Sequence, residues 1–284
     1  MEGVRATEVR SALEAAGRTP SRSLGQNFLV DANLAAKIAR LAWGEGAQRN
    51  AIEIGPGLGS LTVFLAEYFD KVVALESDRF LLEPLRAILQ ERAVSNVELL
   101  HGDAMNFDIA EHLEPEDGWI LAANLPYNVA SPLIATILEN LLAVDRLVVM
   151  VQSEVGERLS ASPGSKAYGA LSVKVQYYAD AKVVLRVPPS VFRPQPKVQS
   201  CVVELKRHDR WTSVVSPLQQ EAMFTLVRAA FGHRRQMLRR SLASFGGDAL
   251  LEACAISPSE RPERLAIQQW FNLGTTWCAR TVEG

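Results

Sequence analysis

The sequence lacks the features that place a protein in a membrane or in an oxidising compartment. No apolar run among its 284 residues approaches the roughly 20 that a membrane-spanning helix needs. The N-terminal segment mixes acidic with basic residues and has no apolar stretch, so we expect no signal peptide. Three scattered cysteines, Cys201, Cys254 and Cys278, form neither a CxxC pair nor an even set. We therefore expect a soluble protein of the reducing cytoplasm.

The sequence also has no pattern of metal ligands. Its four histidines include no HExxH motif, and none lies near a cysteine or carboxylate cluster, so we expect no metal site. Repeats and low-complexity tracts are missing too. A net charge of −2 and 48% apolar residues are typical of a globular chain. This length can bury one large core and a second, smaller one, and we expect a monomer.

Short apolar runs alternate with segments of helical period through the first two-thirds of the chain. The predicted strands are 51–54, 72–75, 97–100, 119–123 and 147–151, and the predicted helices are 33–43, 61–69, 79–90 and 132–142. Asp31, Asp78 and the pair Ser131–Pro132 are the expected helix starts. This alternation predicts an α/β fold with an open, mostly parallel sheet and helices on both faces.

Two further β-rich runs, 182–187 and 200–206, are expected to form an antiparallel pair that completes the sheet. From Pro217 onward the pattern is helical only. We therefore predict an N-terminal extension over 1–24, a Rossmann-like domain over 25–208 and a small all-helical C-terminal domain over 209–284.

Polar signals follow four successive predicted strands. Glycines at 55, 57 and 59 follow the first strand, Glu76 ends the second, Asp103 follows the third, and the tetrapeptide NLPY (124–127) ends the fourth. In an open α/β sheet, ligands bind outside the carboxyl ends of the strands. Glycine lets the backbone approach a ligand closely, and Glu76 is placed to accept hydrogen bonds from ribose hydroxyls. The sequence therefore predicts one ligand crevice with Gly55 and Gly57 in its wall.

The glycine loop favours a nucleoside without a pyrophosphate. Ser60 stands where a dinucleotide-binding loop has its last glycine, and Pro56 removes an N–H that a phosphate would use. S-adenosylmethionine is a cofactor of this kind. Two plainer interpretations stay open, namely that the glycine turn serves packing only and that Glu76 and Asp103 are solvent or helix-start carboxylates.

Seven segments in order resemble one family. They are SLGQNFLVD, EIGPGLGSLT, Leu75–Glu76, GDA, NLPYN, PGSKAYGALSV and VFRPQPKVQS. Over residues 20 to 275 the chain resembles the ribosomal RNA adenine dimethyltransferases, most closely the branch that acts on bacterial small-subunit RNA. The resemblance implies an S-adenosylmethionine-dependent methyltransferase, with S-adenosylhomocysteine as product, that modifies two adjacent adenosines near the 3′ end of 16S rRNA in ribosome biogenesis. It places the cofactor contacts on Asn27, Leu29, Gly55, Glu76, Asp103 and Asn124.

The NLPY segment has the chemistry that methylation of the adenine N6 amine requires. The side-chain carbonyl of Asn124 and the backbone carbonyl of Leu125 are suited to accept the amine hydrogens, and Pro126 fixes the local backbone. Tyr127 is expected to stack on the extruded base, and the resemblance suggests Phe192 on its other side. Alternatively, Tyr127 is merely a half-buried turn residue and Phe192 caps the core.

Basic residues gather between Arg193 and Arg240, where ten Lys or Arg stand against three acids. Such a surface attracts a phosphate backbone. We expect RNA contacts from Lys166, Arg193, Lys197, Arg234, Arg235 and Arg239, with the last two four apart on one helix. Gln236 stands where the family often has another basic residue, and a solvated charged face is the plainer interpretation.

Three other functions stay open. One is a methyltransferase acting on one adenine of large-subunit RNA, although PGSKAYG and FRPQPKVQS point away from it. The second is a non-catalytic assembly or transcription factor on the same fold, against which the intact NLPY segment argues. The third is an NAD-dependent oxidoreductase.

Overall fold

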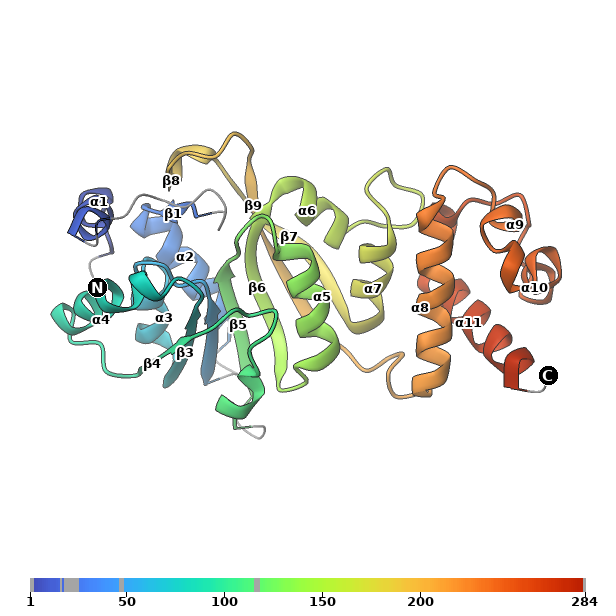
Figure 1. Cartoon of the computed structure of the whole chain (residues 1–284), viewed down its shortest axis with the longest axis horizontal. Coiled ribbons are helices and arrows are strands. Elements are labelled where there is room, and N and C mark those ends of the chain that lie inside the picture. The colour runs from blue at the N-terminus through green and yellow to red at the C-terminus, as the bar shows by residue number, and fades with distance from the viewer. Residues whose placement is uncertain (1–2, 16, 18–25, 46–48, 115–117, 283–284) are drawn as a thin grey trace. The chain divides into compact units, whose positions relative to one another are not determined.

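The computed structural model describes residues 3–15, 17, 26–45, 49–114 and 118–282. Contacts divide the chain into two compact units. Unit 1 comprises Met1–Gly156 and Lys182–Arg207, and unit 2 comprises Glu157–Ala181 and His208–Gly284. Figure 1 gives the labels of the elements in both.

The elements up to the end of the sheet are, in chain order, α1 (Ala6–Ala15), β1 (Phe28–Leu29), α2 (Ala32–Trp43), β2 (Asn50–Ile54), α3 (Thr62–Tyr68), β3 (Lys71–Glu76), α4 (Arg79–Glu91), β4 (Val97–His101), η1 (Ile109–His112), β5 (Trp119–Asn124), α5 (Ala130–Asn140), β6 (Val144–Gln152), α6 (Ser153–Leu159), α7 (Ala170–Tyr178), β7 (Ala179–Val187), η2 (Pro189–Val191), β8 (Phe192–Arg193) and β9 (Ser200–Arg207). The later elements are α8 (Pro217–Gly232), α9 (Leu238–Ser241), η3 (Ala243–Phe245), α10 (Gly247–Ala253), η4 (Pro262–Arg264) and α11 (Ile267–Val282). The helices α1, α6 and α7 were not predicted from the sequence.

In the described part of the chain, the main sheet has seven strands in the order β4-β3-β2-β5-β6-β9-β7. The pairs β3–β4, β2–β3, β2–β5 and β5–β6 are parallel, and β9 runs antiparallel to β6. All five predicted strands are present within a few residues of their expected bounds, and β7 and β9 are neighbours as expected. The predicted α/β fold is therefore confirmed. The strands β2 and β5 are neighbours although β3 and β4 lie between them in the sequence. Because β2 and β5 run parallel, their carboxyl ends lie side by side.

Both faces of the sheet are covered. Ala51 and Ile120 face a core cluster that contains residues of α2 and α3. Their strand neighbours Ile52 and Leu121 point to the opposite face and have no exposed surface either. Continuous apolar runs, rather than alternating ones, are what strands buried on both faces require.

The predicted helix starts are correct at two positions and wrong at the third. Asp31 accepts the N–H of Leu34 at 2.9 Å, and Asp78 accepts that of Phe80 at 3.1 Å. The pair Ser131–Pro132 does not begin α5. Instead the carbonyl of Pro126 accepts the N–H of Ala130 at 3.1 Å, and so the helix starts directly out of the NLPY turn.

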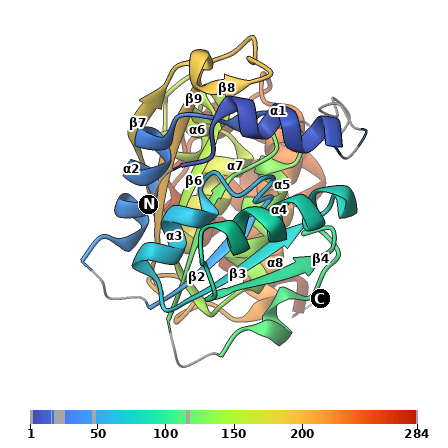
Figure 2. The same ribbon diagram turned by 90° about the vertical axis from the view of Figure 1, so that its left-hand side faces the viewer.

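Helix α1 packs against other elements of unit 1 through a small apolar cluster that is separate from the main core. Val9 and Leu13 contact this cluster, which also contains Leu81 and Ile88 of α4, and Figure 2 shows α1 beside α4. Arg92, just after α4, donates to Glu8 at 2.8 Å. The segment predicted as an N-terminal extension therefore contributes packed structure, although residues 1–2, 16 and 18–24 of it lie outside the described residues.

Unit 2 begins earlier in the chain than the predicted helical domain. The segment Glu157–Ala181 belongs to it because Tyr177 and Tyr178 of α7 pack against Phe224 of α8, and Tyr177 donates to Gln220 at 3.2 Å. A boundary drawn from composition places this segment in the sheet domain, since its sequence does not differ from that of its neighbours.

The predicted helix through FGHRRQMLRRSL is interrupted. Helix α8 ends at Gly232, residues 233–237 form turns, and α9 begins only at Leu238. The N–H groups of Leu238 and Arg239 bond to the carbonyls of Glu260 and Pro258, at 2.8 and 3.1 Å, in place of partners one turn earlier. Arg235 and Arg239 therefore do not share a helix face. Among the described residues, no helix combines the length and apolar character that crossing a bilayer requires.

Candidate active site

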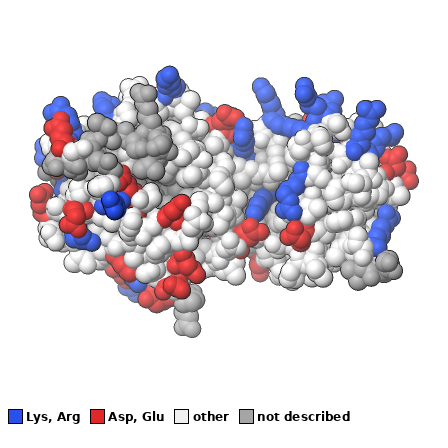
Figure 3. All heavy atoms as spheres, viewed as in Figure 1, with Lys and Arg blue, Asp and Glu red and all other residues white. Residues whose placement is uncertain are grey.

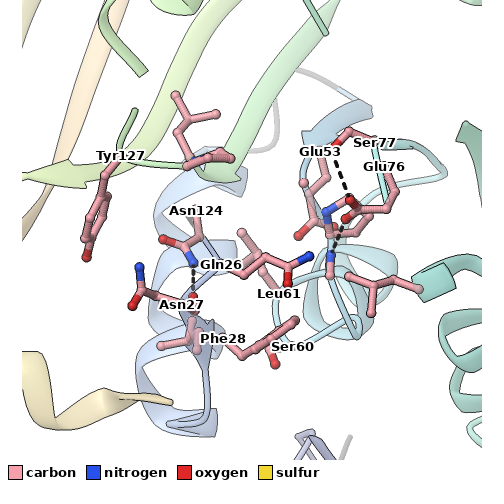
Figure 4. Close-up of a pocket in the computed structure, with 17 residues that line it drawn as sticks. Gln26, Asn27, Phe28, Glu53, Ser60, Leu61, Glu76, Ser77, Asn124 and Tyr127 are labelled. Carbon is pink, nitrogen blue, oxygen red and sulfur yellow. Dashed lines mark hydrogen bonds between the residues drawn. The ribbon is translucent and has the colours of Figure 1, made fainter. Parts of the chain in front are cut away.

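A pocket lies at the carboxyl ends of β2, β3 and β5, within unit 1 (Figure 4). Its walls come from the 26–29 segment, the end of β2 with the glycine loop, the end of β3, and the NLPY segment. The lining residues are Gln26, Asn27, Phe28, Leu29, Glu53, Gly55, Pro56, Gly57, Ser60, Leu61, Glu76, Ser77, Leu81, Asn124, Leu125, Pro126 and Tyr127. The structure thus brings together every predicted cofactor residue except Asp103, and all four residues of NLPY.

The glycine loop follows β2 in a conformation that favours glycine. Gly55, Gly57 and Gly59 have φ of 70°, 59° and 83°, in the region that other residues rarely adopt. A Cβ on Gly57 would also lie 3.2 Å from the ring of Phe28. The loop therefore leaves its backbone open to the pocket, as the sequence predicted.

Glu76 ends β3 inside the pocket and holds the glycine loop. Its Oε2 accepts the N–H of Gly57 at 3.0 Å (Figure 4), and its Oε1 accepts the N–H of Asp78 at 2.8 Å. The side chain is buried, and this burial raises its pKa even though the two backbone N–H groups lower it. A carboxylate with two oxygens at the pocket wall suits a ligand with paired hydroxyls.

Glu53 is a second buried carboxylate in the same pocket, and the sequence analysis did not single it out. Its side chain is 2% exposed, and Oε2 has no hydrogen-bond partner among the described residues. Burial raises its pKa to about 8, and the nearby Glu76 acts in the same direction. The available signal was a charged residue inside the apolar run AIEI, directly before the glycines.

The segment from Gln26 to Leu29 crosses the pocket and joins its two sides. Gln26 donates to Asp78 at 3.0 Å, after the end of β3. On the other side, the carbonyl of Asn27 accepts a hydrogen bond from Asn124 at 3.2 Å. Leu29 pairs with Phe192 in the two-stranded β1–β8 sheet, which was not predicted. The predicted residues Asn27 and Leu29 therefore both line the pocket.

Two oxygen acceptors of the NLPY segment accept no hydrogen bond from the described residues. Asn124 uses Nδ2 to bond Asn27, so its Oδ1 turns toward the Tyr127 side of the pocket (Figure 4). The N–H of Leu125 donates to the carbonyl of Met150 at 3.1 Å, and the carbonyl of Leu125 accepts no hydrogen bond from the described residues. Both acceptors named from the sequence are therefore available to a ligand.

Tyr127 lines the pocket and is half-buried. Its phenol oxygen is 2.6 Å from Oγ of Ser200, at the start of β9. Burial raises the pKa of the phenol above its ordinary value, so the group is neutral at physiological pH. A neutral, half-buried ring in the pocket wall suits contact with a flat base.

Two predicted site residues lie elsewhere. Asp103 is exposed, does not line the pocket, and accepts the N–H of Met105 at 3.0 Å and the amide of Asn106 at 3.2 Å. Phe192 has no exposed surface because its pairing with Leu29 turns the ring into the main core. From the sequence, two interpretations are open for Phe192, and its position agrees with packing in the core. The buried ring offers no face to a base.

The predicted RNA contacts are divided between the units. In unit 1, Lys197 is exposed, while Arg193 donates to the carbonyls of Ser190 and Phe192 at 3.0 and 2.8 Å. In unit 2, Arg234 donates to the backbone carbonyl of Lys166 at 2.7 Å.

Arg235 and Arg239 are exposed as well, and Arg239 lies 3.8 Å from Asp248. Many Lys and Arg side chains project from the face of unit 2 in Figure 3. These positions are compatible with phosphate contacts, which stay a prediction.

Known proteins resemble this chain over nearly its whole length. The family described as ribosomal RNA adenine dimethylase matches residues 18–276. Proteins named ribosomal RNA small subunit methyltransferase A are 41% identical over 275 residues in Alkaliphilus metalliredigens, covering 92% of both chains, and 42% identical over 273 residues in Moorella thermoacetica, covering 92% of this chain and 93% of the relative.

Solved structures share the fold. A dimethyladenosine transferase from Plasmodium falciparum aligns with a TM-score of 0.70 and 23% identity, over 87% of this chain and 95% of its own. The 23S rRNA methyltransferase ErmE aligns with a TM-score of 0.68 and 23% identity, over 88% of this chain and 99% of its own. With the family match across the chain and relatives at about 40% identity, the chain belongs to the ribosomal RNA adenine dimethylase family.

Proposed function

We propose that this protein transfers methyl groups from S-adenosylmethionine to N6 of two adjacent adenosines near the 3′ end of 16S rRNA. One observation carries the proposal. A single pocket contains the buried carboxylate Glu76, suited to a nucleoside, and oxygen acceptors of Asn124 and Leu125 that no described residue bonds, suited to an amine. The residues to which the proposal assigns the two halves of a methyl transfer reaction line one cavity of unit 1.

The residues present fit the methyl donor. Glu76 offers its carboxylate to the ribose hydroxyls, while Gly55 and Gly57 let the backbone approach the ligand. Glu53 adds a buried carboxyl oxygen without a partner among the described residues, which a hydrogen-bond donor of the ligand would satisfy. S-adenosylmethionine supplies a methyl group on a cationic sulfur. Binding of its adenine by Asp103 stays a prediction, because that carboxylate lies outside the pocket lining.

The NLPY residues would activate the amine by holding it. The N6 lone pair of adenine is delocalised into the ring, so the amine is planar and a poor nucleophile. Asn124 Oδ1 and the Leu125 carbonyl accept its two hydrogens and turn the lone pair toward the donor. No strong base is needed, because alignment of two bound groups gives effective molarities of about 10⁵ M or more.

Tyr127 would hold the plane of the base. A stacked aromatic side chain contributes about 1–3 kcal/mol per base. The base must leave its stack to reach this pocket, as in other enzymes that modify bases. The exposed cations of both units would attract the RNA backbone in a salt-dependent way.

The choice of small-subunit RNA rests on the relatives. Those at about 40% identity carry the name small subunit methyltransferase, whereas the 23S enzyme matches at 23% and supports the fold alone. The proposal places the protein on 16S rRNA within the small subunit or its precursor, in the cytoplasm.

The test is to incubate small subunits that lack these methyl groups with labelled donor and to map the modified adenines. Label at two adjacent adenosines near the 3′ end is the expected result. Asn124→Ala should reduce transfer at least about 100-fold, since it removes an acceptor used in the reaction, while Asn140→Ala, at the exposed end of α5, should transfer normally.

Four outcomes would contradict the proposal. Label found only in large-subunit RNA would overturn the substrate. Unchanged transfer by Asn124→Ala would overturn the mechanism. RNA binding without transfer by the wild-type protein would favour an assembly factor, and calorimetric binding of NAD in place of S-adenosylmethionine would favour an oxidoreductase.

A further inference from the structure

The NLPY segment is fixed to three different parts of unit 1. Asn124 bonds the carbonyl of Asn27 in the segment across the pocket, and the N–H of Leu125 bonds Met150 on β6. The third contact is the bond between the phenol of Tyr127 and the hydroxyl of Ser200. The first two hold the acceptor end of the segment, and of these three bonds the third alone involves the Tyr127 side chain.

Ser200 belongs to a strand that does not neighbour the NLPY strand. The sheet order is β5-β6-β9, and Ser200 opens β9 opposite Gln152, the last residue of β6. The phenol of Tyr127 therefore reaches past the end of β6 to bond the next strand. Neither the glycine loop nor the 26–29 segment takes part in this contact.

The hydroxyl of Ser200 is well suited to fix the ring. Ser200 has no exposed surface, and its oxygen lies 2.6 Å from that of Tyr127. A buried hydroxyl without a partner is costly, so the pair is held together. The Cα end of Tyr127 follows Pro126, whose ring limits the backbone. With both ends held, the long axis of the tyrosine ring has one direction.

In the proposed reaction, the second methyl transfer would depend more on the Tyr127 ring than the first. Adenine offers two N6 hydrogens to Asn124 and Leu125, whereas N6-methyladenine offers one. The monomethylated base thus loses one of two hydrogen bonds to the NLPY oxygens, and stacking on Tyr127 supplies a larger share of the force that holds it.

We propose that Ser200 is a positioning residue, which orients the Tyr127 ring so that the monomethylated adenine is held for its second methylation. This inference rests on the proposed function. It assigns to Ser200 an effect on the ratio of dimethylated to monomethylated product, in addition to any effect on total transfer.

The test compares Ser200→Ala, Tyr127→Phe and the double variant on small subunits lacking the methyl groups. Mono- and dimethyladenosine are measured by mass spectrometry during single turnovers. Each single change should slow the second transfer by about fivefold, the effect of one net hydrogen bond, and slow the first transfer less. Because both remove the same bond, the double variant should be no slower than either single one.

Two controls keep the test decisive. Ser172→Ala removes another fully buried hydroxyl, one that donates to the carbonyl of Arg158 in unit 2, and should leave the product ratio unchanged. If Ser200→Ala does not fold, Tyr127→Phe still removes the same hydrogen bond by changing its half-buried partner. The product ratio of Tyr127→Phe then tests the inference.

The outcomes separate this inference from the proposed function. If the wild-type protein transfers no methyl group, the proposed function fails. If the wild-type protein dimethylates but the single changes slow both transfers equally, or neither, the positioning role of Ser200 is wrong. Effects that multiply in the double variant would also contradict it, since they would show that the two hydroxyls act separately.

Discussion

The carboxylate of Glu76 accepts the N–H of Gly57 at 3.0 Å, which joins the end of β3 to the loop that follows β2. Its other oxygen accepts the N–H of Asp78 at 2.8 Å. Glu76 was expected from the sequence to bind a ligand. The structure adds that it also builds the wall of the pocket, because it fixes the glycine loop from the neighbouring strand.

Glu76→Gln should weaken binding of S-adenosylmethionine by about tenfold or more. The amide keeps the size of the carboxylate but replaces one acceptor oxygen with an NH2 donor. This NH2 group would face the N–H of either Gly57 or Asp78, so one of the two hydrogen bonds is lost. Hydrogen bonds to a charged group contribute about 1.5–3 kcal/mol each. Isothermal titration calorimetry measures the effect, with the exposed Glu111→Gln as control. Equal affinity of the Glu76 variant and the wild type would show that this carboxylate does not contribute to binding of S-adenosylmethionine.

Glu53 should make the stability of the protein depend on pH. Its pKa is raised from 4.5 to about 8 in the fold, so between these values the folded state holds a proton that the unfolded state has released. Its contribution to stability is therefore present at low pH and is lost as pH rises through this window. The slope is at most about 1.4 kcal/mol per pH unit.

Urea unfolding at pH 5 and pH 8 checks this prediction. Glu53→Gln, which carries no titrating group, should lose less stability than the wild type between the two values. A smaller slope should remain, since burial also raises the pKa of Glu76. Identical slopes for the variant and the wild type would mean that Glu53 is ionised throughout.

Arg207 should stabilise the helix that follows the NLPY segment. It lies at the end of β9 and donates to carbonyls at the C-terminal end of α5, at 2.7 Å to Leu138 and 3.2 Å to Leu141, and to Val144 at 2.9 Å. A cation at this end of a helix also interacts favourably with the helix dipole.

Arg207→Lys keeps the charge but cannot reach several carbonyls at once, and should lower the free energy of unfolding by about 2 kcal/mol. Arg186→Lys, at an exposed position of β7, should change it by less than about 0.5 kcal/mol. Chemical denaturation measures both changes. If Arg207→Lys lowers the free energy of unfolding no more than the control does, the contacts of Arg207 do not stabilise the fold.

The parts predicted correctly from the sequence depend on local signals. The run that became β2 is apolar and ends in glycine, and Asp31 and Asp78 act as caps within a few residues of their partners. Such patterns depend on neighbours in the chain alone. They sufficed to place Glu76 and NLPY at one pocket, because parallel strands present their carboxyl ends together.

The parts that were missed depend on contacts distant in sequence. Phe192 is turned into the core by pairing with Leu29, 163 positions earlier in the chain. The helix expected through Arg235 is broken because the start of α9 bonds to a segment about 20 residues later. The role of Ser200 follows from its contact with Tyr127, which no local pattern indicates.

Arg235 is a cation of unit 2 whose expected effect on RNA binding does not include the loss of an ion pair. It is exposed in the turn after α8, and no ion pair joins it to another described residue. Arg234 and Arg239, in contrast, lie 3.9 Å from Glu263 and 3.8 Å from Asp248. A free arginine that contacts a phosphate releases about one counterion.

Arg235→Ala should therefore weaken binding to small subunits at every salt concentration and reduce the slope of log K against log salt by about 1. Gln236→Arg adds a cation beside it and should increase the slope by a similar amount. Arg86→Ala removes an exposed arginine from α4 of unit 1, where it pairs with Glu83, and should leave the slope unchanged. Filter binding from 50 to 300 mM salt gives all three slopes. If Arg235→Ala and Arg86→Ala show the same slope, the turn between α8 and α9 does not contact the RNA backbone.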